Sequence, residues 1–299
     1  MRFIAGSNQA TASWSRLHRS AKHRKVLAVL TMAILLSGCA ASPLVSGGGL
    51  SSYDGLTQSN GKVTKSRLLV RKEKVMAAKT VNISPTIFPA SAAPKLSNAQ
   101  RALVANAVDR ALCISLSDRF QVVQADASAD LSVRASVTQA TPTDELAAGV
   151  SAATSIGTKF VDMGTNVPIP IPRVPIGLGN LSIEAEAVDP AGQQQAAILW
   201  GRGATMFFSS PKVSKASDAY DLAAEFGDDF AHLLAKGESP FKGVGIKLPS
   251  WQKISSGVGM APKYKACENF GRSPGVAGFV AGKLGMPPEW TDKGATPKP

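Results

Sequence analysis

The hydrophobic pattern of the chain opens with an apolar segment near the amino terminus, Val26 to Leu36. This segment is about 11 residues long, whereas a helix needs about 20 apolar residues to cross a bilayer. A basic stretch that ends in Arg24 and Lys25 precedes it. A basic region followed by a short apolar region is typical of a secretory signal peptide, so we expect residues 1–38 to direct export and then to be removed.

The next stretch, residues 39–61, is rich in serine and glycine and has few apolar positions. Gly47, Gly48 and Gly49 lie at its centre. Such a composition has too little apolar surface to pack and predicts a flexible tether. We therefore expect the folded domain to begin at about residue 62.

Helices are predicted where apolar residues recur at three- and four-residue intervals. The first such pattern covers Ser97 to Asp118 and opens with a capping-box sequence. The second begins at Ser214 or Ser217 and ends at Gly237. A weaker pattern, rich in small residues, predicts a further helix over Glu145 to Met163.

Strands are predicted where apolar and polar residues alternate, or where turn residues bound short apolar runs. The region from Ser66 to Phe88 lacks helical periodicity and predicts extended structure. The prolines of Val167 to Pro175 predict an extended arm. The predicted strands cover Thr80 to Ile83, Phe120 to Gln124, Asp130 to Gln139, and a hairpin from Leu181 to Phe208 with its turn at Asp189 to Gly192.

The order of these elements is strand, helix, two strands, hairpin and helix. It predicts an α+β fold, a single domain over residues 62–237 with an antiparallel or mixed sheet and two main helices on one face. After Gly237 the chain is rich in Gly, Pro and Lys, and no apolar periodicity lasts longer than one turn. We treat residues 238–299 as a C-terminal extension. Its many large apolar residues predict that part of it packs back on the domain.

The net charge of +12 first suggests a nucleic-acid-binding protein. Residues 1–38 contain six basic residues and no acidic residue, so the remainder has 27 basic residues against 21 acidic ones, a net charge of +6. The rest of the chain shows no basic stripe with interleaved aromatic residues. We therefore expect no nucleic acid among its partners.

The residues that end the apolar segment form a specific motif, Leu36-Ser37-Gly38-Cys39. By resemblance to the motif of bacterial lipoproteins, small residues at Ser37 and Gly38 would give a protease access to the backbone, and the Cys39 thiol would carry a diacylglyceryl group. The motif resembles the lipobox of bacterial lipoproteins, where several acyl chains, each giving about 0.8 kcal/mol per buried methylene, form a durable anchor. The alternatives are an ordinary secretory signal with an incidental cysteine and an anchor that stays uncleaved.

The residue after the lipidated cysteine carries information about the target membrane. In lipoproteins of diderm bacteria an aspartate there favours the inner membrane, whereas this chain has Ala40. The resemblance therefore implies a protein held in the outer membrane by acyl chains on Cys39 and facing the periplasm.

Two cysteines remain after the lipobox, Cys113 and Cys267. An exported protein meets an oxidising compartment, in which such a pair can persist as a disulfide. A bridge would close a loop of about 150 residues and stabilise the fold by up to about 4 to 5 kcal/mol. The alternative is two buried free thiols.

The stretch from Gly49 to about Gly237 resembles bacterial lipoproteins of the domain-of-unknown-function family numbered 3313. The resemblance implies an envelope compartment and an α/β fold, and it implies no catalytic residues. Besides the lipobox, it rests on Gly49-Leu-Ser-Ser-Tyr-Asp-Gly-Leu56, Val81-Asn-Ile-Ser-Pro85, the following helix with Phe120-Gln-Val-Val123, and Ile183-Glu-Ala-Glu-Ala-Val-Asp189 with its turn at Gly192.

Candidate chemistry is sparse. His232 is the only histidine after residue 38, which excludes a metal site built from several histidines. The glycine clusters lack the spacing of dinucleotide or phosphate loops. We expect no metal and no cofactor, and we interpret His232 as a helix-capping or solvated residue.

Glu184 and Glu186 are the one pair of carboxylates with a suggestive spacing, because residues two apart on a strand point to the same face. They could share a cation or act as acid and base. The alternative is a solvated sheet face, with Arg202 on the next strand as a partner. Tyr53 and Asp54 are either a recognition site or the first residues pinned to the domain.

These observations favour a non-enzymatic, periplasm-facing lipoprotein that acts as an accessory or binding module for an envelope protein. One alternative is a periplasmic hydrolase or metal-assisted enzyme built around Glu184 and Glu186. Another is a structural envelope protein that binds cell wall or lipid through its mildly basic surface.

Overall fold

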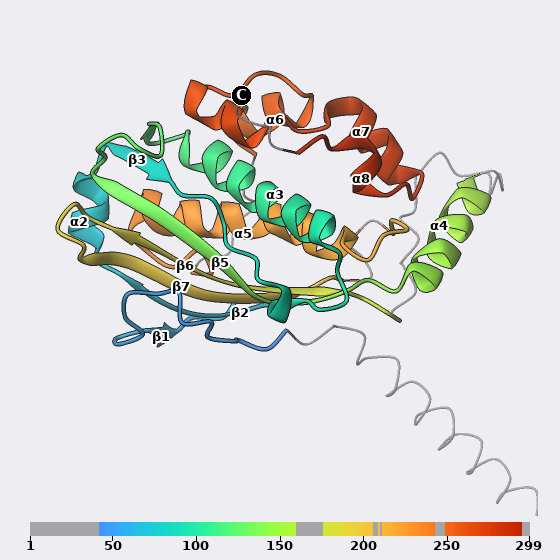
Figure 1. The fold of residues 1–299 in the computed structure, drawn as a ribbon, viewed down its shortest axis with the longest axis horizontal. Helices are drawn as coiled ribbons and strands as arrows, with labels where there is room; N and C mark the ends of the chain where they lie inside the picture. Colours follow the sequence, from blue (N-terminus) through green and yellow to red (C-terminus); the bar gives the residue numbers. More distant parts are fainter. Residues whose placement is uncertain (1–41, 160–175, 206–208, 210, 243–248, 295–299) are drawn as a thin grey trace, which may run out of the picture. The chain divides into compact units, whose positions relative to one another are not determined.

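The computed structural model describes residues 42–159, 176–205, 209, 211–242 and 249–294 (Figure 1). The chain divides into two compact units, residues 1–38 and 39–299, and every described residue belongs to the second unit. The expected signal peptide, the lipobox Leu36–Cys39 and the proline-rich arm Val167–Pro175 lie outside the described residues.

The strands form one mixed, seven-stranded sheet with the order β1-β2-β7-β6-β5-β3-β4. Pairing is antiparallel from β1 through β2, β7 and β6 to β5, and parallel between β5 and β3 and between β3 and β4. The mixed sheet confirms the predicted α+β class. The strands are β1 Thr57–Gln58, β2 Thr64–Val70, β3 Thr80–Ile83, β4 Gln121–Val122, β5 Leu131–Thr141, β6 Asn180–Val188 and β7 Gln194–Gly203.

The two main helices lie where the sequence predicts them. In α3 the predicted capping box is present, since Ser97 Oγ accepts from Gln100 N and Gln100 Oε1 accepts from Ser97 N. α5 ends at Gly237, whose φ of +61° is left-handed and suits glycine. The helical segments are α2 Lys72–Ala77, η2 Ala90–Ala92, α3 Asn98–Leu116, α4 Glu145–Lys159, α5 Ser217–Lys236, α6 Trp251–Gly257, η3 Lys265–Phe270, α7 Gly275–Lys283 and α8 Pro288–Thr291.

The structure differs from the sequence prediction in one stretch, and it shows strand pairings that the sequence did not predict. The stretch predicted as wholly extended contains the short helix α2 as well as β2 and β3. The predicted strands that became β4 and β5 are not neighbours, because β3 lies between them and pairs parallel with both. Sequence periodicity defines a strand but carries no information about which strand pairs with it.

The main core lies between α3, α5 and one face of the sheet (Figure 1). Trp200 of β7 is 1% exposed and packs edge-on against Phe226 of α5, with 5.6 Å between the ring centroids. Its indole Nε1 donates to Asp229 Oδ2 over 2.9 Å, so the polar end of the buried ring is satisfied. The two helices therefore cover one face of the sheet, as predicted.

The opposite face of the sheet is covered by residues 42–56, which we call the N-terminal strap. Leu50 and Leu56 of the strap form a second apolar cluster with Ala197 and Leu199 of β7. Ser42 is buried at the beginning of the strap. The prediction of a flexible tether is therefore wrong for residues 42–61. The strap is held partly by hydrogen bonds from its backbone N–H groups, and these do not depend on the apolar side chains that a sequence pattern detects.

The described part of the C-terminal region forms a further layer on the outer side of α3 (Figure 1). Ala266, Cys267 and Phe270 of η3 join the main core, and a disulfide links Cys113 to Cys267 with 5.7 Å between the Cα atoms. The sequence predicted that the domain ends at residue 237, but the main core continues into the C-terminal region. Among the described helices, none is long and apolar enough to cross a membrane.

Candidate functional site

Glu184 and Glu186 lie side by side on β6 beneath the N-terminal strap, and they are 1% and 0% exposed. Glu184 accepts hydrogen bonds from Gly47 N over 2.9 Å and from Gly49 N over 2.6 Å. The Tyr53 hydroxyl donates to the same carboxylate over 2.6 Å. Burial and the neighbouring Glu184 raise the pKa of Tyr53, so the phenol keeps its proton and remains a donor.

Glu186 is satisfied in the same way. Ser51 donates to it through its backbone N–H over 2.8 Å and its hydroxyl over 3.0 Å, and Gln194 Nε2 donates over 2.7 Å. Arg134 forms an ion pair with it. Burial alone would raise the pKa of Glu186, but the hydrogen bonds from Ser51, Gln194 and Arg134 lower it below its usual value.

The strap can approach these carboxylates closely because Gly47 and Gly49 have no side chain. A Cβ atom on Gly49 would lie 2.7 Å from Glu184 Oε1, and one on Gly47 would lie 2.9 Å from the same oxygen. Both distances are shorter than real Cβ contacts. The glycines that suggested flexibility are therefore needed for close packing.

The expectation of a solvated sheet face is wrong, because the strap covers it. Arg202 pairs with Glu225 of α5 over 3.2 Å and not with the two strand glutamates. Each of the four carboxylate oxygens of Glu184 and Glu186 accepts at least one hydrogen bond. Tyr53 is one of the residues that pin the strap. This arrangement can hold a segment of chain, and the described residues contain no cluster suited to a metal ion.

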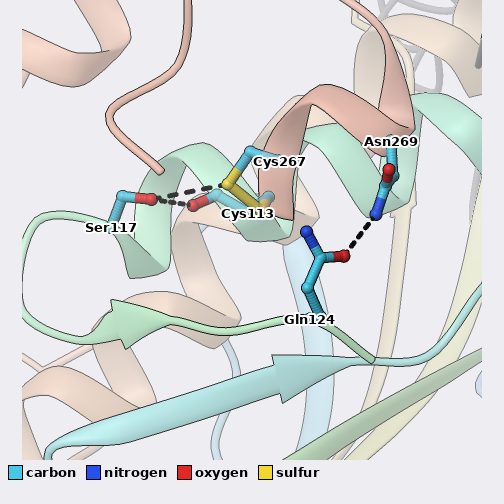
Figure 2. The surroundings of a disulfide bond; sticks show 5 residues. All are labelled: Cys113, Ser117, Gln124, Cys267 and Asn269. Carbon is cyan, nitrogen blue, oxygen red and sulfur yellow. Dashed lines mark hydrogen bonds between the residues drawn. A yellow bond between two sulfur atoms is a disulfide. The ribbon is translucent and has the colours of Figure 1, made fainter. Parts of the chain in front are cut away.

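Figure 2 shows the disulfide between Cys113 of α3 and Cys267 of η3. Near it, Asn269 Nδ2 donates to Gln124 Oε1 over 2.8 Å, which ties η3 to the loop after β4. His232 is half-buried on α5 and lines an open cavity with Asp118 and Lys253. The structure therefore does not bring His232 together with Glu184 or Glu186, which lie under the strap.

The C-terminal layer has an unusually apolar exterior. Trp251, Phe279 and Trp290 are 69%, 64% and 65% exposed. Exposed apolar residues that include several aromatic side chains are typical of interaction sites. We call the following set the C-terminal apolar surface: Trp251, Ile254, Val258, Met260, Val276, Phe279, Val280, Leu284, Met286 and Trp290.

The charges around this surface are mainly positive. All six basic residues of the described stretch 249–294 are exposed. Of its three acidic residues, Asp292 is buried in an ion pair with Arg110, and Glu289 accepts hydrogen bonds from Gln100 and Ser214. Glu268 forms an ion pair with a neighbouring arginine. The exposed basic residues are Lys253, Lys263, Lys265, Arg272, Lys283 and Lys293.

Sequence reasoning missed this surface because its helices are too short to show a periodicity. The signal that was present is the accumulation of large apolar residues in a stretch rich in glycine and lysine. Only packing shows which of them are buried, such as Phe270, and which are exposed.

A family model described as "Protein of unknown function (DUF3313)" matches residues 46–230, which is more than half of the chain. The chain belongs to this family. The predicted resemblance to the family is therefore confirmed. The DUF3313 match begins within the strap and includes both strand glutamates, and it ends before the C-terminal apolar surface.

The solved structures that match this DUF3313 protein include two of PelC, and both are only weakly similar to it. The PelC dodecamer from Paraburkholderia phytofirmans has 10% sequence identity and a TM-score of 0.30, and the match covers 60% of this chain and 96% of that chain. A PelC point variant from the same organism has 10% sequence identity and a TM-score of 0.29. The match covers 60% of this chain and 95% of that chain. At these TM-scores the likeness carries no argument about this chain. No curated protein matches it.

Proposed function

We propose that the protein is a lipid-anchored, periplasm-facing lipoprotein and a non-enzymatic binding module of the bacterial cell envelope. The observation that carries the proposal is the order of layers in the folded unit. The strap lies on one face of the sheet, α3 and α5 lie on the other, and the C-terminal apolar surface belongs to the layer beyond α3 (Figure 1). A membrane anchor and a partner could therefore engage opposite sides.

The strap determines how far the domain can stand from an anchor at Cys39. Ser42 is buried, and its hydroxyl lies 3.0 Å from the hydroxyl of Ser182 on β6. Only two residues separate Cys39 from Ser42. At about 3.5 Å per residue, the three steps span roughly 10 Å. An acylated Cys39 would thus hold the strap side of the domain close to the bilayer.

The C-terminal apolar surface would then face away from that bilayer. Its apolar centre and basic surroundings fit an envelope protein with an apolar patch and acidic residues around it. An anionic lipid surface would fit the same chemistry, but the proposed anchor would place lipid on the opposite side. The geometry does not favour a hydrolase at Glu184 and Glu186, because the strap covers both carboxylates and its donors bind them.

The anchor is tested by Cys39→Ser. We expect the variant to remain at the size of the unprocessed chain, to incorporate no labelled fatty acid and to change its distribution in membrane fractionation. Unchanged processing and fractionation would refute the anchor.

The binding surface is tested by photo-crosslinking in cells at position 279 or 290. Leu146 on α4, which is 83% exposed, serves as the matched control position. We expect an envelope protein to crosslink at the first two positions and not at the control. The purified pair should then bind, and added salt should weaken the complex. Crosslinks to lipid alone, to a second copy alone, or equally at all three positions would contradict the proposal.

Phe279→Ser provides a quantitative version of this test, with Leu146→Ser as its control. We expect the first variant to weaken binding of the purified partner by about tenfold or more, because burial of a Phe side chain contributes about 1.5 to 3 kcal/mol. The second variant should bind like the unchanged protein.

A further inference from the structure

A cavity of about 300 Å³ lies between the sheet, α3 and η3, away from the strap and from the C-terminal apolar surface. The last residues of β3 and β4, Ile83 and Val122, form part of its wall. These two strands are parallel, so the cavity lies at their carboxyl ends. In sheets with parallel strands this edge is a common place for ligand binding.

Asp109 of α3 lines this cavity and is 5% exposed. Its Oδ1 accepts hydrogen bonds from the backbone N–H and the hydroxyl of Thr86. Both hydrogen bonds fall on Oδ1, and no described residue donates to Oδ2. Burial raises the pKa of Asp109 to about 7, although the Thr86 hydrogen bonds act in the opposite direction.

No positive charge compensates this carboxyl group. Asp109 is the only titratable side chain among the described residues that line the cavity. None of the described ion pairs includes it. A buried carboxylate without a counter-charge is costly, and a cationic ligand would reduce that cost.

The cavity is also lined by two asparagine side chains, Asn106 and Asn269, whose amide oxygens can accept hydrogen bonds. Asn106 Nδ2 donates to the carbonyl oxygen of Phe270 over 2.9 Å, and Asn269 Nδ2 donates to Gln124 (Figure 2). Both amide nitrogens are therefore used by the protein itself. The amide oxygens of Asn106 and Asn269 accept no hydrogen bond from the described residues. The cavity thus offers acceptors to a ligand that carries donors.

We propose that this cavity binds a small organic ammonium ion. Its N–H groups would donate to Asp109 Oδ2 and to the amide oxygen of Asn106, and its hydrocarbon part would pack on Ile83, Val122 and Phe270. The combination of an apolar wall with a few convergent polar groups is typical of small-molecule sites. Thr86 donates to one oxygen of Asp109, and the ammonium ion would donate to the other. Binding here is independent of the proposed role as an envelope binding module.

The probe for this site is benzylammonium, with benzyl alcohol as a neutral analogue of the same shape. In ligand-observed NMR titrations of the full-length protein near pH 8, we expect saturable binding of benzylammonium and clearly weaker binding of benzyl alcohol. Asp109→Asn keeps an oxygen for Thr86 and removes the charge. It should weaken benzylammonium binding by about tenfold to a hundredfold, since charge-assisted hydrogen bonds are the strong ones.

Two further variants separate this site from general charge attraction and from misfolding. Asp126→Asn removes an exposed carboxylate in the nearby loop and should leave the affinity unchanged. Val123→Phe should fill the cavity and weaken binding as much as Asp109→Asn does, without changing the charge. The backbone spectrum of each variant reports on its fold.

The affinity of the unchanged protein for benzylammonium should also fall between pH 8 and pH 5 as Asp109 takes up a proton. The proposal is overturned if the unchanged protein shows no saturable binding, or if the Asp109→Asn and Val123→Phe variants bind benzylammonium as tightly as it does.

Discussion

Buried carboxylates in this protein have opposite environments. Glu186 is surrounded by donors from Ser51, Gln194 and Arg134, and its pKa is lowered. Asp109 has only Thr86, and its pKa is raised. At Glu186 the donors, which include the charged Arg134, outweigh the effect of burial, whereas at Asp109 burial outweighs the two hydrogen bonds from Thr86.

The raised pKa of Asp109 predicts a pH-dependent stability. Between pH 3.8 and about 7 the folded state holds the proton and the unfolded state does not. The stabilisation that this proton gives the folded state is therefore present at low pH and is lost as the pH rises through this range. Relative to Asp109→Asn, we expect the unchanged protein to lose up to about 4 kcal/mol in free energy of unfolding. Urea denaturation of both proteins across this range measures the difference, and a constant difference would contradict the pKa shift.

Gly49 should tolerate no side chain. Gly49→Ala places a Cβ atom against Glu184 Oε1. It also disturbs the hydrogen bond that the backbone N–H of residue 49 donates to this oxygen. We expect a loss of about 2 kcal/mol or more in the free energy of unfolding. Gly257→Ala is the control, because a Cβ atom there meets nothing within 4 Å. Equal stability of the two variants would show that the strap is not bound as described.

At the scale of elements, the C-terminal layer is held on α3 by covalent and ionic contacts. Besides the disulfide, Arg110 of α3 forms a buried ion pair with Asp292, and the Tyr220 hydroxyl also bonds to Asp292. Burial raises the pKa of Tyr220, and the nearby Asp292 adds to this effect against the opposing charge of Arg110. Tyr220 therefore stays a donor at any physiological pH. These contacts make the layer part of the fold.

The disulfide should stabilise η3 more than the sheet. We expect the double variant Cys113→Ser, Cys267→Ser to lose about 3 to 5 kcal/mol in free energy of unfolding, because the bridge closes a long loop. In the double variant, amide hydrogen exchange should be faster in η3 than in β5, β6 and β7. In those strands, exchange follows global unfolding. Unchanged protection of Ala266 to Phe270 would contradict this assignment. Reduction of the unchanged protein should reproduce the effect.

At the scale of the whole molecule, the folded unit extends well beyond the predicted domain of residues 62–237. It includes the strap before that range and the C-terminal layer after it. The strap covers one face of the sheet, and η3 covers part of α3. The domain therefore depends on both flanking segments for its burial.

A chain that ends at Gly237 should fail to fold normally. It would lose Ala266, Cys267 and Phe270 from the main core together with the disulfide. We expect it to aggregate or to unfold without a cooperative transition. Circular dichroism during thermal unfolding checks this. A cooperative transition within a few degrees of that of the full chain would show that the C-terminal layer is an independent addition.

The sequence by itself determined the local elements. The three- and four-residue periodicity defined α3 and α5, the Ser97 capping box defined where α3 begins, and the Asp189 to Gly192 turn defined the hairpin of β6 and β7. These features depend on residues within a few positions of one another, so their patterns can be read along the chain. The family could also be read from the sequence, because its motifs are short runs of neighbouring residues.

Only the tertiary structure decided what covers each element. The strap is bound by backbone N–H groups to carboxylates more than a hundred positions away, and a backbone donor leaves no trace in the sequence. The environment of Asp109 likewise depends on Thr86 and on the absence of a positively charged side chain among the described residues that line the cavity. Burial and pairing are properties of distant segments brought together, and the amino-acid pattern of one segment cannot specify them.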